Sequence, residues 1–91
     1  MEKYDKHEFK KLSLAKRYKV LKEQGEHVAA RQIGNHLIHL YVVNGYFVEM
    51  WIIFAINQIQ WIEVQNNQEI INEYSNQVDL NELLSDDNQE D

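Results

Sequence analysis

The sequence predicts an α+β domain, in which an N-terminal helix, a four-stranded antiparallel β-meander and a C-terminal helix follow one another. Two observations predict the meander. The turn-forming pairs Gly34-Asn35 and Asn44-Gly45, and the segment 54–57, recur at ten-residue intervals. The runs of eight residues between them are rich in Val, Ile, Tyr, Phe and Trp, whose side chains fit a pleated sheet. A third observation adds the helices, because apolar residues recur at helical spacing on both sides of the meander.

The first element is expected to be a helix from about Phe9 to Gln24. Gly25 then supplies a residue type that commonly ends a helix. One narrow stripe of this helix can be buried, and it consists of Leu14, Ala15, Tyr18 and Leu21. The remaining surface is basic and is formed by Lys10, Lys11, Lys16, Arg17, Lys19 and Lys22. We expect these basic side chains to be solvated.

The meander follows from the chemistry of the turns. Asn and Gly tolerate positive φ, so Asn44-Gly45 is a strong signal for a two-residue hairpin loop. The four strands are expected at about 27–33, 36–43, 46–53 and 58–64. A two-residue loop also fixes the register of the flanking strands. The predicted cross-strand pairs are Val43 with Tyr46, Tyr41 with Val48, and His39 with Met50.

The last element is again expected to be helical. Asn66 lies three residues before Glu69, as in a capping box. A second such pair, Asp79 and Glu82, predicts one or two further short turns. The apolar residues of the two segments are Ile70, Ile71, Tyr74 and Val78, followed by Leu80, Leu83 and Leu84. Residues 1–84 are therefore expected to form a single domain, and residues 85–91, which contain no apolar side chain, a disordered acidic tail.

Two other structures are open to the apolar middle of the chain. A continuous helix from about Val28 to Val64 contains no proline, but its internal glycines would each cost about 1 kcal/mol relative to alanine. A membrane-spanning helix at 37–56 has the required twenty residues. It would bury Glu49 near its centre, at a cost of roughly 2.5 kcal/mol or more. Both costs favour the strands, and we expect no membrane association.

Strict alternation along the strands sorts the side chains onto two faces. One face is the predicted core, covered by both helices: Val28, Ala30, Leu37, Tyr41, Val43, Tyr46, Val48, Met50, Ile52, Ile59 and Trp61. The other face carries the apolar residues Ala29, Ile33, Ile38, Leu40, Val42, Phe47, Trp51, Ile62 and Val64. Mixed with them on this second face are His27, Arg31, His36, Glu49 and Gln60.

The second face is too apolar to stay in water, because a monomer seldom exposes an apolar patch larger than a few hundred Å². Packing of two sheets in a symmetric homodimer would cover it. The candidate interface residues are Ile38, Leu40, Phe47, Trp51 and Ile62. The alternative is a monomer in which one helix covers each face.

The same face holds the candidates for a ligand site, which are Arg31, His36, Glu49 and Trp51. Arg31 and Glu49 are expected two strands apart, with backbones about 12 Å from each other, a gap that their long side chains can close. An Arg and a carboxylate beside a Trp and a His could hold a small polar ligand or act as an acid-base pair. The alternative is an ion pair that lets the sheet bury its only inward charges.

Charge is distributed unevenly along the chain. Residues 1–31 contain all nine basic side chains and five acidic ones, a net charge of +4, whereas residues 32–91 contain ten acidic side chains and no basic one, a net charge of −10. The basic helix raises the alternative of nucleic-acid binding, which the overall charge of −6 and the lack of a recognisable binding motif disfavour.

The sequence supports no cofactor and no metal site. His36 and His39 have an odd spacing that points them to opposite faces of a strand, and no third ligand converges on either. The chain has no cysteine, and its N-terminus has no apolar run of signal-peptide length, so we expect a cytoplasmic protein.

These observations predict a small non-catalytic interaction or scaffold module that acts as a homodimer, with an unknown protein partner as a further option. The alternatives are a ligand binder or enzyme that uses the four candidate site residues, and a nucleic-acid-binding protein.

Overall fold

The structure is a computed structural model that describes residues 2–75. Within this range the element order is α1 (Lys6–Lys10), α2 (Leu14–Gln24), β1 (Glu26–Ile33), β2 (His36–Val43), β3 (Tyr46–Ile53), the 3-10 helix η1 (Phe54–Ile56), β4 (Gln58–Val64) and α3 (Gln68–Asn72). The four strands form one antiparallel sheet in the order β1-β2-β3-β4. The α+β class and the meander predicted from the sequence are confirmed.

The chain reverses direction at the three predicted positions. Gly34, Asn44, Gly45 and Asn57 all have positive φ, as the turn chemistry requires. The register of β2 against β3 pairs Val43 with Tyr46, as predicted. These reversals rule out a continuous helix from 28 to 64. Among residues 2–75, no helix is long and apolar enough to cross a membrane.

The N-terminal helix differs from the expectation, because it is two helices and not one. Asp5 and Glu8 form a capping box at the start of α1. Ser13 then caps α2, its side chain accepting the backbone N–H of Lys16 at 3.2 Å. This new cap breaks the helix predicted from 9 to 24, and the break lets Phe9 turn its ring into the core.

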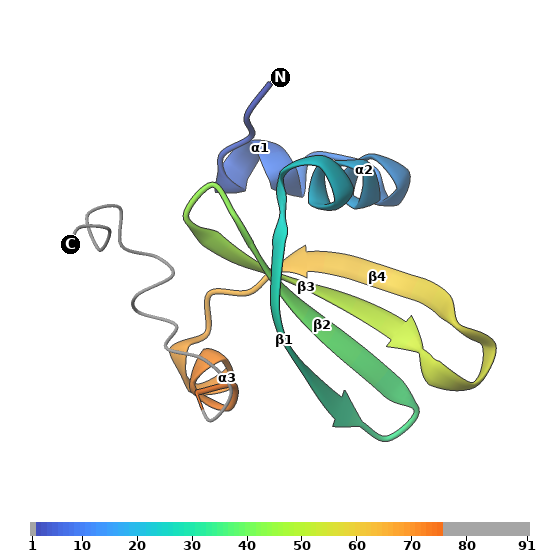
Figure 1. Ribbon diagram of the computed structural model, residues 1–91. Coiled ribbons are helices and arrows are strands. Elements are labelled where there is room, and N and C mark those ends of the chain that lie inside the picture. The colour runs from blue at the N-terminus through green and yellow to red at the C-terminus, as the bar shows by residue number, and fades with distance from the viewer. Residues whose placement is uncertain (1, 76–91) are drawn as a thin grey trace.

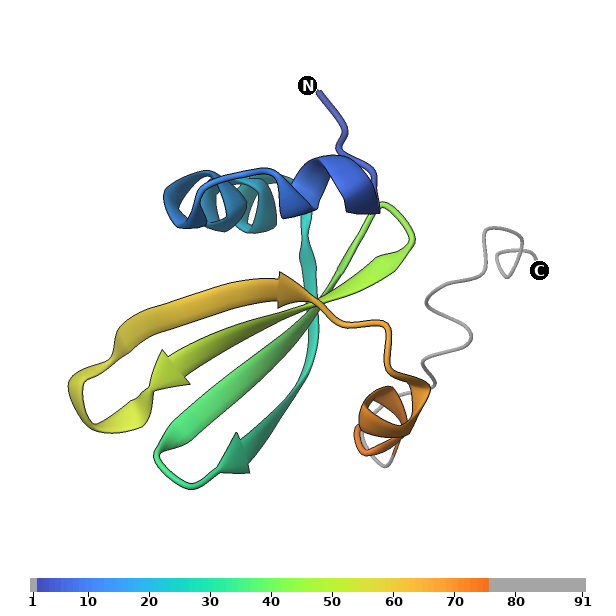
Figure 2. The ribbon, with the colours of Figure 1, turned by 180° about the vertical axis from the view of Figure 1, so that it is seen from behind.

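The helices cover both faces of the sheet, so the expectation that they share one face is wrong. Figures 1 and 2 show α1 and α2 on one side of the sheet and α3 on the other. The α1–α2 side is built around Phe9, Val20, Leu21, Val43, Tyr46, Val48, Met50 and Ile62. The α3 side, called the α3 face below, is built around Ala29, Leu40, Phe47, Ile71 and Tyr74.

Two β-bulges change the predicted face of four residues. The register of β1 against β2 shifts between His27 and Ala29. The register of β4 against β3 shifts opposite the step from Trp51 to Ile52 of β3. Each bulge inserts one extra residue, which reverses the alternation beyond it. The residues that change face are His27, Val28, Ile62 and Val64. Ile62 thereby joins the α1–α2 core, opposite Met50.

Helix α3 starts one residue later than the predicted capping box. Asn67, rather than Asn66, accepts the backbone N–H of Glu69 at 2.9 Å. Ile71 and Tyr74 of the predicted stripe are buried. The expected turns at 79–84 and the expected tail at 85–91 lie outside the described residues.

Candidate functional site

The structure brings Arg31 of β1 and Glu49 of β3 together on the α3 face, across the intervening strand β2. The Nη2 atom of Arg31 lies 3.1 Å from the Oε2 atom of Glu49. The Glu49 side chain is fully buried, and that of Arg31 is largely buried. The expected proximity of these two residues therefore follows from the register, and it forms an ion pair shielded from water.

Both oxygens of the Glu49 carboxylate accept further hydrogen bonds. The hydroxyl of Tyr74, which follows α3, donates to Oε2 at 2.5 Å. The Nε2 atom of Gln65, which follows β4, donates to Oε1 at 2.8 Å. We call Arg31, Glu49, Gln65 and Tyr74 the polar cluster. It draws side chains from β1, from the connection after β4 and from the segment after α3 onto one buried carboxylate.

The polar cluster holds α3 in place. The side-chain oxygen of Gln65 accepts the backbone N–H of Asn67, the residue that caps α3. Arg31 also pairs with Glu73 at 2.9 Å, and its guanidinium lies 5.5 Å from the ring of Tyr74. Burial, and then the hydrogen bond to Glu49, raise the pKa of Tyr74 well above its usual range. The Tyr74 hydroxyl thus stays protonated and remains a donor.

The other two site candidates lie next to the polar cluster rather than in it. His36 bonds to the side-chain oxygen of Gln60, and its ring meets Trp51 edge to face at 5.4 Å. Trp51 lies two residues beyond Glu49 on β3, and its ring is 6.0 Å from the Arg31 guanidinium. The four candidates share one face, but Arg31 and Glu49 are already occupied by protein partners.

The candidates for a dimer interface are mostly buried within a single chain. Three of the candidates are buried on the α3 face, namely Ile38, Leu40 and Phe47. A fourth, Ile62, is buried in the core on the opposite side of the sheet. Trp51 alone of the five candidates keeps part of its surface exposed. In this arrangement Trp51 is the candidate whose surface a second copy can reach, and the predicted interface stays a prediction.

Arg17 has a role that the sequence pattern does not reveal. It is buried, whereas Lys16 and Lys19 beside it are exposed. Its guanidinium donates to the backbone carbonyls of residues 10, 12 and 62, joining α1, α2 and β4. Within residues 2–75, no carboxylate forms an ion pair with it. Arg17 is thus a structural residue rather than part of a solvated basic surface.

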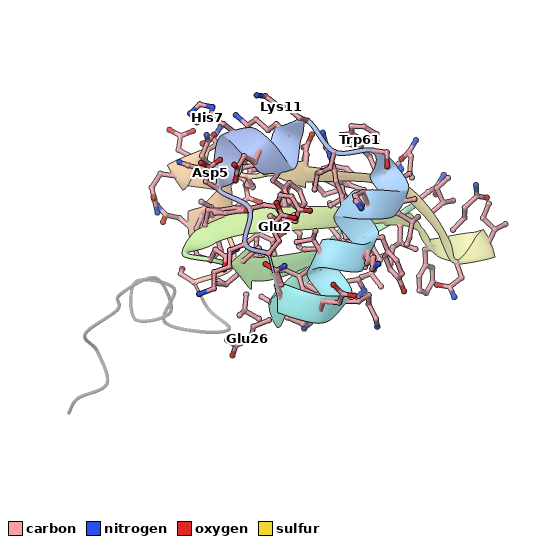
Figure 3. The ribbon with its side chains drawn as sticks, turned by 90° about the horizontal axis from the view of Figure 1, so that it is seen from above. Glu2, Asp5, His7, Lys11, Glu26 and Trp61 are labelled. Carbon is pink, nitrogen blue, oxygen red and sulfur yellow. The ribbon has the colours of Figure 1, made fainter. Side chains whose placement is uncertain are left out.

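Two aromatic rings complete the environment of Arg17. The guanidinium lies 4.7 Å from the centre of the Trp61 ring and 5.6 Å from that of Phe9. Figure 3 shows Trp61 beside the connection between α1 and α2. Such cation–π contacts suit a planar guanidinium that has no acidic partner.

A histidine pair arises from the bulge in β1. His27 was expected on the face opposite His39, but the bulge brings the two rings together, with Nε2 of His27 2.8 Å from Nδ1 of His39. Burial, and then His27, lower the pKa of His39. In the described part of the chain, no group of three His, Cys, Asp or Glu side chains could hold a metal ion.

A small cavity of about 160 Å³ lies beside the β2–β3 turn and touches the polar cluster at Gln65. It is lined by Lys6, Gly45, Tyr46, Phe47, Gln65, Asn66, Gln68 and Ile71. A second cavity, of about 100 Å³, lies between the N-terminal segment and α2. Both fall below the roughly 300 Å³ of a typical small-molecule site.

The end of the sheet formed by the β1–β2 and β3–β4 connections exposes apolar side chains and no charged one. Phe54 is 62% exposed, Ile56 61% and Ile33 46%. We call these three residues the hairpin end. The N–H of Phe54 donates to the carbonyl of Asn35 at 2.9 Å, which ties the two connections together. Between residues 32 and 62, Glu49 is the sole Asp, Glu, Lys or Arg of the sequence.

Comparison of the chain with models of protein families, with curated proteins and with solved structures found no match.

Proposed function

We propose that this chain is a small non-catalytic interaction module that forms a homodimer through the hairpin end. The observation that carries the proposal is the exposure of Phe54, Ile56 and Ile33 on a surface without charged side chains. The cores of protein interfaces are depleted of charge and enriched in aromatic residues. A cytoplasmic setting suits a chain without cysteine.

The polar cluster favours this function over ligand binding. Each carboxylate oxygen of Glu49 already accepts hydrogen bonds from protein donors, and Arg31 is paired with two carboxylates. A ligand would have to displace Tyr74 or Gln65 and leave buried polar groups without partners, which is costly. We therefore assign the cluster a structural role.

The test is the mass of the chain in solution, measured by sedimentation velocity over a range of protein concentrations. We expect the wild type to sediment as a dimer and the double variant Phe54→Ser/Ile56→Ser as a monomer with an unchanged circular dichroism spectrum. Loss of the two apolar side chains removes contact area from the proposed interface without touching either core cluster.

The matched control is Tyr18→Ser, which removes an exposed aromatic ring from α2, away from the hairpin end. This variant should remain dimeric. A wild type that stays monomeric at the highest concentration contradicts the homodimer. A dimer that is lost in the Tyr18 variant and kept in the double variant places the interface on α2 instead.

A further inference from the structure

The bulge in β1 creates a pair of imidazole rings on the α1–α2 side of the sheet. His27 lies directly opposite Tyr41 of β2, and His39 is the preceding residue of β2 on the same face. The Nε2 atom of His27 and the Nδ1 atom of His39 are 2.8 Å apart, and the ring centres are 4.8 Å apart. His27 is exposed and His39 is half-buried, so a solute can approach the pair from the side of His27.

The separation of the two nitrogens suits coordination of one metal ion. Imidazole nitrogens bind divalent transition-metal ions at about 2.0–2.1 Å. Two nitrogens on one ion are therefore about 2.9 Å apart when the angle at the ion is 90°, and about 3.3 Å apart at the tetrahedral angle that Zn²⁺ prefers. The observed 2.8 Å fits the 90° angle, which is typical of square-planar or tetragonal Cu²⁺ and Ni²⁺.

We propose that His27 and His39 form a two-histidine site for Cu²⁺ or Ni²⁺. The ion binds Nε2 of His27 and Nδ1 of His39 and takes the place of the proton that these two nitrogens share in their hydrogen bond. Each ring then carries its proton on its other nitrogen. Water completes the coordination, because no group of three His, Cys, Asp or Glu side chains forms among the residues that the structure describes.

Two features prepare the pair for an ion. The register fixes the backbone of both histidines, and the ring of Tyr41 packs against that of His27 edge to face at 5.3 Å. Burial, and then His27, lower the pKa of His39, so this ring is neutral and able to coordinate near neutral pH. The site is independent of the homodimer, because His27 precedes Ile33 of the hairpin end by roughly 20 Å along β1.

The first experiment titrates the full-length chain with Ni²⁺ and follows the heat of binding by calorimetry. We expect one ion to bind per chain, and we expect His27→Asn and His39→Gln each to weaken the affinity about a hundredfold, because each leaves a single ligand. The matched control is His36→Gln, which removes a histidine from the opposite face of β2 and should leave the affinity unchanged. Wild-type affinity in either variant of the pair, or a wild type that binds no Ni²⁺, would overturn the proposal.

A second measurement uses the wild-type chain alone and does not depend on how well any variant folds. The chain has four histidines. Paramagnetic Cu²⁺ broadens the nuclear magnetic resonances of the groups that bind it. At a small fraction of one equivalent, we expect Cu²⁺ to broaden the Cε1–H resonances of His27 and His39 and to leave those of His7 and His36 sharp. Equal or stronger broadening at His7 or His36 would overturn the proposal, as would resonances of the pair that stay sharp.

Discussion

The hydroxyl of Tyr74 donates a 2.5 Å hydrogen bond to the fully buried carboxylate of Glu49. This contact joins Tyr74, two residues after the end of α3, to the middle of β3, 25 residues earlier in the chain. A buried carboxylate must be paired to be tolerated, and here Arg31, Gln65 and Tyr74 share that task. The position of α3 therefore depends on one charge in the sheet.

Glu49→Gln should destabilise the fold severely. It removes the negative partner of Arg31 and replaces one of the two accepting oxygens with an NH₂ group, and breaking a buried ion pair costs about 3–5 kcal/mol. Urea denaturation measures the loss. Glu63→Gln is the matched control, because Glu63 pairs with Glu49 in the register and forms no ion pair within residues 2–75. A similar effect of the two substitutions would contradict a structural role for Glu49.

Tyr74→Phe should cost about 1–3 kcal/mol, because it leaves the Glu49 carboxylate with one donor fewer and keeps the ring in the core. The effect should be smaller in a Glu49→Gln background, and the difference gives the coupling between the two groups. The double-mutant cycle can be measured by urea denaturation of the variants that remain folded. Strict additivity would show that the 2.5 Å contact contributes no coupling energy.

Arg17→Met should destabilise the fold by about 3 kcal/mol, because it deprives three backbone carbonyls of their donor. Arg17→Lys should recover little of this, since an ammonium group lacks the planar fork that reaches several acceptors. The control is Lys16→Met on the exposed side of α2, with an expected change within about 0.5 kcal/mol. Thermal denaturation distinguishes them, and an Arg17→Lys variant as stable as the wild type would refute the geometric argument.

Gly45→Ala should cost about 1 kcal/mol or more, because the residue has a φ of +87°. An added Cβ would meet no atom within 4 Å, so the cost is one of backbone conformation rather than of space. Gly45→Asn should recover part of the stability, since Asn tolerates the left-handed region. Equal stability of the Ala and Asn variants would argue against this cause.

Stability should fall between pH 10 and about 12, because burial, and then Asp5 and Glu8, raise the pKa of Tyr46 to about 12. The folded state holds this proton more tightly than the unfolded state does. The contribution is therefore complete below pH 10 and is lost as the pH rises through the folded pKa. Tyr46→Phe should show a shallower decline when urea denaturation is repeated across this range. If the stability of the wild type and of Tyr46→Phe fell equally steeply with pH, the assignment of the decline to Tyr46 would be wrong.

The limits of the strands can be predicted from the sequence because Gly and Asn, which tolerate positive φ, mark the turns between them. Three strands have the predicted limits, and β1 starts one residue earlier than expected. The pairing of Arg31 with Glu49 also follows, since register and alternation place both on one face. A bulge has no comparable local signal, so the predicted faces of Ile62 and His27 are wrong.

The rest of the site depends on tertiary contacts. Tyr74 belongs to the predicted stripe of α3, and its hydroxyl reaches Glu49 only because α3 packs on the face opposite α1 and α2. Nothing in the pattern marks Gln65, which lies in a connection, or distinguishes Arg17 from the lysines around it. Those roles depend on the tertiary structure, which brings Gln65 to the carboxylate of Glu49 and Arg17 to three backbone carbonyls.

The association of two copies through the hairpin end is tested most directly by nuclear Overhauser effects between subunits, in a mixture of ¹³C-labelled and unlabelled chains. We predict intermolecular contacts from the ring of Phe54 to the methyl groups of Ile33 and Ile56 of the second copy. A mixture in which these contacts are missing, while intermolecular contacts to the surface of α2 are present, would contradict the proposed interface.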